Sequence, residues 1–442
     1  SRGLGDVYKR QGQALPPILA ASSIFVLTYV GILSERVHRT IVGLAGAVMM
    51  IAVGGWLNFY DMPRAAAAID FNTISLLLGM MIMVGILGKT GLFSYLAVRA
   101  AQLTHGSAWR LMLTLGLLTT VVSMVLDNVT TIMVVAPVTL SIAEIMGVSP
   151  IPFLLGEAIL SNTGGVATLI GDPPNVMIGS AANLSFNDFL IHLAPIVIVA
   201  WVVTQGILLF IFRKDLRHAA DPEPLAKLDA RRALVDPKTA RRMSIVLGGT
   251  IILYLLHDRI GLIPGMVALI GASIALLWIR PPVEELMHEI HWDVLLFFIS
   301  LFTIVGGLEA AGVLGLIANQ ISGIAEHGIT IAALAVLWGG AILSAIVDNI
   351  PFTMAMIPII AGLEASGVAV GPLWWALAMG VGFGGNGTPI GSTANVVTVA
   401  ISERTETPIT FRTWIHSGSL TALACLLVAS AALIVAIKLG LM

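Results

Sequence analysis

The chain has 442 residues, of which 57% are hydrophobic and only 11% are charged, and its net charge is −2. Soluble domains carry about 25% charged residues, so this composition excludes a water-soluble enzyme, a disordered chain and a protein that binds nucleic acid. The single cysteine, Cys425, excludes a disulfide framework and a cysteine-ligated metal cluster. We therefore expect an all-α polytopic membrane protein that has the lipid bilayer as a partner.

The first thirteen residues match nothing downstream, and we set 1–13 aside as a non-native scar or a disordered tail. A spanning helix needs about 20 mostly apolar residues. Runs with the composition of such spans follow in chain order at Ala14–Leu33, Thr40–Leu57, Thr73–Gly88, His192–Phe212, Met243–Leu256, Leu262–Ile279, Trp292–Leu308 and Gly418–Ile437.

Four further apolar stretches do not have the form of a simple span. Residues 108–146 and 330–365 are nearly twice the spanning length with a polar centre, which predicts re-entrant hairpins that enter and leave on the same side. Residues 151–180 and 372–401 are interrupted by Gly, Pro and Asn, which predicts broken helices. The segments 93–102 and 313–320 are typical of interfacial helices. The total is ten spans and two hairpins.

Basic residues set the expected orientation. The segment Arg213–Arg242 contains nine Lys and Arg and separates two hydrophobic halves, so we expect 213–242 to be a cytoplasmic linker. Counting spans outward from it places Arg39, Lys89 and Arg280 on the same side. This arrangement predicts an integral protein of a prokaryotic inner (plasma) membrane.

The two halves share a repeated pattern. The runs VGILGKTGL (84–92) and VGGLEAAGV (305–313) are offset by 221 residues, and the same offset relates Asp127-Asn128 to Asp348-Asn349. After one deletion an offset of 220 relates Gly171 to Gly391. Because each half has five predicted spans, an odd number, we expect two inverted-topology repeats at 14–212 and 243–442, an architecture common among secondary transporters.

Polar residues concentrate at the hairpin tips and at the interruptions of the broken helices. Interrupted helices expose carbonyls and amides that hydrocarbon cannot satisfy, so they persist where they line a cavity. Carbonyl, Asn and Thr oxygens suit Na⁺, whereas helix N-termini suit anions. Close packing of glycine-rich helices is the structural alternative. The candidate ion- or substrate-binding residues are Ser123, Asp127, Asn128, Thr130, Asn162, Thr163, Gly164, Gly165, Gly171, Asp172, Asn175, Ser344, Asp348, Asn349, Thr353, Gly384, Asn386, Gly387, Thr388, Gly391, Ser392 and Asn395.

Asp127 and Asp348 are the most informative candidates, because an ionised carboxylate near the bilayer centre costs at least about 2.5–3.5 kcal/mol. No Lys or Arg lies close in sequence to either. The remaining options are a bound cation, protonation, or access to water, and the first two are the two halves of sodium/proton exchange. Alternatively, each Asp caps the second hairpin arm, a role compatible with binding. Asp172 has Ser392 at the equivalent position, so it either binds or caps a turn.

Two other interpretations of the polar residues carry less weight. Carboxylates at membrane depth are also the catalytic groups of an intramembrane aspartyl protease, but the duplicated Asn, Thr and Gly do not suit an aspartyl dyad. His192, His288 and His291 show no metal-ligand spacing.

Four runs resemble the ion transporter superfamily: LDNVTT (126–131), GGVATLIGDPPNV (164–176), DNIPFT (348–353) and GGNGTPIGSTANVV (384–397). This superfamily includes divalent anion/sodium symporters, citrate carriers, and arsenite and sodium/proton antiporter families, and the runs are most similar to the branch that contains the melanosomal P protein. The resemblance implies an elevator-type transporter, a homodimer and no organic cofactor. It also implies sodium sites at Ser123, Asn128 and Gly171 and at Ser344, Asn349 and Gly391.

The hairpin tips depart from one part of that superfamily. Dicarboxylate members carry Ser-Asn-Thr there, whereas this chain has Asp127-Asn128-Val129 and Asp348-Asn349-Ile350. Two added negative charges would repel a dianion, and the tips resemble those of sodium/proton antiporters. We therefore expect a secondary active ion transporter that exchanges sodium and protons at the two tips. The alternative is a sodium- or proton-linked carrier, or conductance, of an organic or inorganic anion such as citrate or a dicarboxylate.

Overall fold

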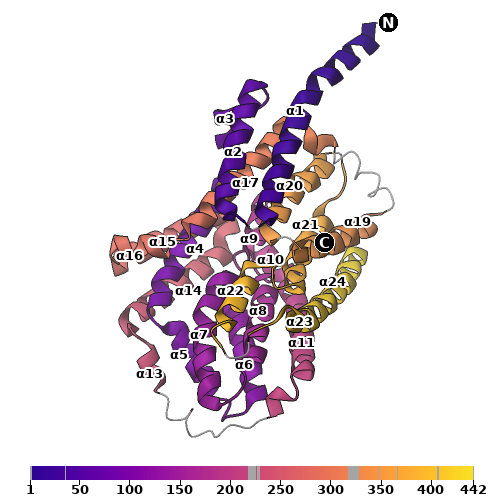
Figure 1. Ribbon diagram of the computed structural model, residues 1–442. Helices are drawn as coiled ribbons and strands as arrows, with labels where there is room; N and C mark the ends of the chain where they lie inside the picture. Colours follow the sequence, from indigo (N-terminus) through magenta and orange to yellow (C-terminus); the bar gives the residue numbers. More distant parts are fainter. Residues whose placement is uncertain are drawn as a thin grey trace.

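The computed structural model describes residues 2–34, 36–217, 225, 229–316, 328–346, 348–365, 367–405 and 408–441. All regular elements in these ranges are helices (Figure 1). They are α1 (Arg2–Leu33), α2 (Arg39–Trp56), α3 (Met62–Ala68), α4 (Phe71–Lys89), α5 (Leu92–Gln102), α6 (Ala108–Ser123), α7 (Asn128–Met146), α8 (Ile151–Gly165), α9 (Pro173–Ala182), α10 (Phe186–His192), α11 (Ala194–Ile211), η1 (Asp215–Arg217), α13 (Ala230–Ala233), α14 (Pro237–Ile260), α15 (Pro264–Ile279), α16 (Val283–Glu289), α17 (Trp292–Ala310), α19 (Ile329–Ile346), α20 (Asn349–Ala365), α21 (Gly371–Gly384), η2 (Gly385–Gly387), α22 (Thr393–Ser402), α23 (Phe411–Trp414), η3 (Ile415–Ser419) and α24 (Leu420–Leu439).

The expected all-α membrane architecture is confirmed. Within the described part of the chain, nine helices are long and apolar enough to cross a membrane. Seven of them correspond to expected full spans, and the other two, α7 and α19, are hairpin arms. The eighth expected span is α15, which has only 16 residues because it begins after Ile263, with Pro264 in its first turn.

Helix α1 begins at Arg2 and includes residues 2–13. Of the expected interfacial helices, the first is α5, whereas 317–320 of the second lie outside the described residues. The linker 213–242 is described only in part, at 213–217, at 225 and from 229 onward.

The two expected hairpins enter the molecule from opposite ends. Helices α6 and α7 occupy the lower part of Figure 1 and turn upward at residues 124–127, whereas α19 and α20 lie in its upper part. Both tips reach the same region at mid-height, because Asn128 and Asn349, the first residues of the second arms, line one cavity. Opposed hairpins are what an inverted repeat requires.

The packing of the halves is reciprocal. In the first half α6 packs on α8 and α7 on α22, and in the second half α19 packs on α21 and α20 on α9. Likewise α2 of the first half packs on α17 of the second, and α4 packs on α15. Equivalent helices therefore exchange partners across the halves, as expected for a pseudo-two-fold arrangement.

The helices form two groups that meet at the cavity. One group, here called the frame, contains α1, α2, α4, α14, α15 and α17, which pack on one another. The other, here called the hairpin group, contains the two hairpins, the two broken helices, α11 and α24. Close crossings hold each group together: a Cβ on Gly79 of α4 would lie 2.6 Å from the carbonyl carbon of Ala268 in α15, so only glycine permits this helix–helix distance.

Candidate functional site

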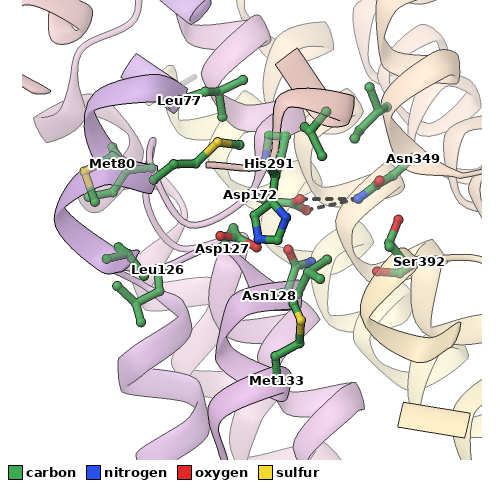
Figure 2. Close-up of a pocket in the computed structure, with 18 of the residues that line it drawn as sticks. Leu77, Met80, Leu126, Asp127, Asn128, Met133, Asp172, His291, Asn349 and Ser392 are labelled. Atoms are coloured by element: carbon green, nitrogen blue, oxygen red, sulfur yellow. Dashed lines mark hydrogen bonds between the residues drawn. The ribbon is translucent and has the colours of Figure 1, made fainter. Parts of the chain in front are cut away.

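A cavity of about 210 Å³ lies where the frame meets the hairpin group. The frame contributes mainly apolar side chains of α4, including Leu77 and Met80, together with three polar residues, Arg39, His291 and Asp293. The hairpin group contributes Asp127, Asn128, Asp172, Asn349, Ser392 and Thr393. Figure 2 shows that the polar residues come from both hairpin tips and both broken helices. The structure thus brings together candidates that lie far apart in the sequence, such as Asp127 and Ser392.

Four helices begin at this cavity. Asn128, Pro173, Asn349 and Thr393 are the first residues of α7, α9, α20 and α22, and all four line it. Helix N-termini carry partial positive charge and unpaired amides. Three of these four helices are preceded by an aspartate, at positions 127, 172 and 348. Asp127 and Asp348 each accept a backbone N–H at the start of their helix, whereas Asp172 makes no such bond, so carboxylates occupy two of the four anion-attracting helix ends.

Asp127 caps α7. Its carboxylate accepts the backbone N–H of Thr130 at 2.9 Å and the Thr130 hydroxyl at 2.6 Å. The capping role that was an alternative for this residue is therefore present, and Asp127 also lines the cavity. Within the described residues no basic side chain is hydrogen-bonded or ion-paired to Asp127.

Asp348 has a different environment from its repeat equivalent. Position 351 is proline where the first half has Thr130, so neither the hydroxyl nor the N–H of that position is available. Instead, Arg39 of α2 donates to Asp348 Oδ2, and Thr393 donates to the same oxygen at 2.9 Å. This ion pair spans 309 residues of sequence, which is why proximity in sequence gave no sign of it.

Asp172 is the second carboxylate that no basic side chain contacts in the described part of the chain. Its side chain is buried, with 2% of the residue exposed. The Asn349 amide donates to both of its carboxylate oxygens at 3.3 Å, as the dashed lines of Figure 2 mark. The carboxylates of Asp348 and Asp127 act on Asp172 electrostatically, Asp348 more strongly. Of the carboxylates that line the cavity, Asp127 and Asp172 come from a hairpin tip and a broken helix of the first half, whereas Asp293 of the second half comes from the frame helix α17.

Asn162 connects the hairpin group internally. Its oxygen accepts the Asn128 amide at 2.8 Å and the Ser392 hydroxyl at 3.0 Å. Its own amide donates to Asn386 at 2.9 Å and to Asn395 at 2.8 Å. These bonds join the first hairpin and the first broken helix to the second broken helix. Asn162 itself is buried and does not line the cavity, whereas its partners Asn128 and Ser392 do.

The interruptions of both broken helices have the same form. A Cβ on Gly171 would lie 2.6 Å from Gly165 O and 2.7 Å from Ser123 O, and a Cβ on Gly391 would lie 2.6 Å from Gly385 O and 3.0 Å from Ser344 O. Two carbonyl oxygens therefore converge on each glycine. The sodium positions that the resemblance implies, at Ser123, Asn128 and Gly171 and at Ser344, Asn349 and Gly391, stay a prediction.

The remaining candidates brace this backbone. Asn175 donates to the carbonyls of 165, 166 and 168, and Asn395 donates to those of 385 and 388. The hydroxyls of Ser123 and Ser344 tie the first hairpin arms to the broken helices, through Ser161 O at 2.7 Å and Val381 O at 2.8 Å. The last candidates lie in the same frameworks but make helix contacts rather than cavity contacts: Thr163, Gly164, Thr353, Gly384, Gly387 and Thr388.

Sequence reasoning missed four polar cavity residues: Thr393 of α22 and three residues of the frame. Arg39 was assigned to a membrane boundary, yet its side chain is 22% exposed and lies at the cavity. His291 was set aside for lack of a metal pattern, and Asp293 was not considered, although both line the cavity. All three stand at the start of a frame helix, α2 or α17. Polar residues at the N-terminal turn of a span are ordinarily interfacial, so no local signal distinguished them.

Comparison with known proteins places the chain in a family. A family model described as "Citrate transporter" (CitMHS) matches residues 29–380. The chain is 38% identical to a 46 kDa membrane protein of Mycobacterium leprae, over 90% of this chain and 94% of that protein. It is 36% identical to an uncharacterized transporter of Mycobacterium tuberculosis, over 91% and 94%. It is also 30% identical to the human P protein, over 89% of this chain and 57% of that protein.

A solved structure supports the fold. The Alcanivorax borkumensis YdaH transporter, whose topology is described as unusual, superposes with a TM-score of 0.64 at 15% identity and covers 91% of this chain and 99% of that one. The relatives named as transporters are not enzymes. This chain is an integral membrane transporter, and it belongs to the citrate transporter (CitMHS) family within the ion transporter superfamily.

Proposed function

We propose that this chain is a secondary active transporter that exchanges Na⁺ for protons, with Asp127 and Asp172 as the residues that hold either ion. The observation that supports this most strongly is the pairing of these two carboxylates at one cavity without a bonded basic side chain in the described residues. Two anionic groups close together favour one bound cation or one shared proton, and cannot both remain ionised and unpaired cheaply in a low dielectric.

The ligand chemistry suits a small hard cation. Carboxylate, carboxamide and carbonyl oxygens are its preferred donors. Asn128 and Asn349 lie at the cavity next to the carboxylates, and the convergent carbonyls of Ser123 and Gly165 lie behind them. Within the described residues no group of three His, Cys, Asp or Glu side chains is arranged to hold a metal ion by itself, so carboxamide and carbonyl oxygens would complete the coordination of a weakly held, exchangeable ion.

Transport requires the cavity to reach each side of the membrane in turn. We propose that the hairpin group moves as one body against the frame, in the elevator manner. The Asn162 network supports this, because it connects both halves within the hairpin group. Around the cavity the border between the groups consists largely of Leu and Met side chains of α4. A few side-chain hydrogen bonds also cross it, from Arg39 to Asp348 and Thr393 and from Asn72 to Ser180, and the proposed movement has to break them.

A sodium- or proton-linked carrier of an organic anion is the second candidate. The name of the matching family favours it, and so does the fourth helix N-terminus, α22, which follows Ser392 rather than an aspartate. Against it, three carboxylates already stand at the other helix ends, and the one guanidinium among the described cavity residues is engaged by Asp348. We therefore place cation exchange first.

The test uses the purified chain in proteoliposomes with an internal acid pH and an entrapped pH-sensitive dye. A Na⁺ pulse in a buffer without organic anions should alkalinise the lumen, and choline should not. Asp127→Asn and Asp172→Asn should each abolish the response, whereas Asp215→Asn, at an exposed position outside the cavity, should retain it. A proton flux that requires citrate together with Na⁺ would instead support the anion carrier.

A further inference from the structure

The two halves of the cavity differ in one respect that their shared ancestry does not predict. Asp127 and Asp348 occupy equivalent positions, yet only Asp348 has a guanidinium on it. Several substitutions accompany that difference. The second half lacks the Thr130 hydroxyl, because Pro351 replaces it, and lacks the second carboxylate, because Ser392 replaces Asp172. The hydroxyl of Thr393 stands where the first half has Pro173, so the clear difference is one carboxylate fewer and one fixed positive charge more in the second half.

Arg39 is held firmly in that position. Its guanidinium donates to Asp348 and, at 3.0 Å, to the Thr393 hydroxyl, which itself donates to Asp348. The guanidinium carbon also lies 5.3 Å from the centre of the Phe297 ring, a cation–π distance. At an offset of 221 residues the first half has Leu76, which offers no aromatic face.

No equivalent arginine is available to Asp127. The repeat equivalent of α2 is α15, and Pro264–Ile279 contains no Lys or Arg. Accordingly, Asp127 and Asp172 face the cavity with their charge unmatched by any bonded basic group among the described residues. One half has a built-in cation, and the other has a position for a mobile one.

We propose that Arg39 is a tethered cation that fills the second of two symmetry-related cation positions in this conformation, so that each chain binds and exchanges a single mobile cation, at Asp127 and Asp172. This inference rests on the cation exchange proposed above and deepens it, because it names the coupling number and the residue that sets it. Arg39 acts on specificity and stoichiometry rather than as a ligand of the transported ion.

The substitutions that test this differ in whether they retain the charge. Arg39→Lys keeps a tethered cation, so the chain should still bind one Na⁺. Arg39→Gln leaves Asp348 unpaired, so a second Na⁺ should bind, and the double variant Arg39→Gln/Asp348→Asn should return to one. Isothermal titration calorimetry of Na⁺ against the purified full chain, in choline-balanced buffer, measures the number directly. Size-exclusion chromatography reports whether each variant remains folded.

Asp348→Asn provides an independent test that does not depend on the folding of Arg39→Gln. It should leave one Na⁺ per chain, with affinity weakened by less than about tenfold through the uncompensated charge of Arg39. If both aspartates bound mobile cations, Asp348→Asn would remove one of two. Two Na⁺ per wild-type chain, or one Na⁺ in folded Arg39→Gln, would overturn the inference.

The outcomes separate this inference from the function on which it rests. A wild-type chain that binds no Na⁺, or binds it equally well as Asp127→Asn, contradicts cation exchange itself. A wild-type chain that binds one Na⁺ through Asp127 while Arg39→Gln gains none contradicts only the role given to Arg39. If Arg39→Gln loses stabilisation by citrate in a thermal-shift assay and gains no Na⁺, Arg39 is an anion ligand and the inference is wrong.

Discussion

Asn349 of the second hairpin donates its amide to both carboxylate oxygens of Asp172 in the first broken helix, at 3.3 Å. This contact joins the two inverted halves at the cavity. It leaves the Asp172 carboxylate held in one orientation beside Asp127 (Figure 2). A cation that entered the cavity would therefore meet a preformed pair of oxygen donors, one from each end of the sequence run 127–172.

Asp127→Asn should separate capping from ion binding. Asn caps helices about as well as Asp, so the free energy of unfolding should change by less than about 0.5 kcal/mol. Loss of the charge should weaken Na⁺ binding by at least about tenfold, equivalent to about 1.4 kcal/mol. Thermal unfolding with and without Na⁺ measures both quantities.

The control for this substitution is Asp127→Ala, which removes the cap as well as the charge. It should lose about 1 kcal/mol of stability in addition to Na⁺ binding. If Asp127→Asn retains wild-type affinity for Na⁺, the carboxylate is only a cap.

Gly171→Ala should be strongly disruptive, because the new Cβ would lie 2.6 Å from Gly165 O and 2.7 Å from Ser123 O. Backbone must shift to admit it, which costs about 1–3 kcal/mol, and the displaced carbonyls should abolish transport. Gly391→Ala should behave alike. Circular-dichroism melting of the purified variants gives the stability change.

Gly248→Ala is the matched control, since a Cβ at this position in the middle of α14 would have no other atom within 4 Å. Alanine there should stabilise the chain by about 0.4–1 kcal/mol and leave transport intact. Equal effects of Ala at 171 and at 248 would show that the close approach at Gly171 has no consequence.

Asn162→Ala should weaken the hairpin group. It removes the partner of four side chains on three elements, so buried polar groups lose hydrogen bonds at about 1–3 kcal/mol each where no water replaces them. Transport should fall together with thermal stability. Asn187→Ala, at an exposed residue that bonds only Leu255 O, is the control and should lower neither.

Much of the fold could be predicted from the sequence. The hairpins at 108–146 and 330–365 were expected because each apolar run was too long for one span, and their polar centres at Asp127 and Asp348 mark the turns. The broken helices were expected from clusters of Gly, Pro and Asn, which weaken a helix together, whereas the single prolines Pro137 and Pro358 lie inside continuous helices. These signals lie within single segments of the chain, so they can be recognised without knowledge of the tertiary packing.

The sequence could not predict the side-chain contacts between the two halves. The pairing of Arg39 with Asp348 depends on α2 packing against α17 and on both lying beside the second hairpin. Asn162 became the centre of a network for a similar reason, because its partners at 386, 392 and 395 come from the other half. Contacts of this kind arise from tertiary packing, and no spacing within one segment encodes them.

The most direct test of the central claim is the uptake of radioactive ²²Na⁺ into proteoliposomes that contain the purified chain. With an acidic lumen and no organic anion on either side, the wild-type chain should accumulate Na⁺ against its gradient until the pH gradient collapses, and Asp127→Asn and Asp172→Asn should not. Accumulation that is indifferent to the pH gradient, or that occurs only when citrate accompanies Na⁺, would contradict exchange at these two carboxylates.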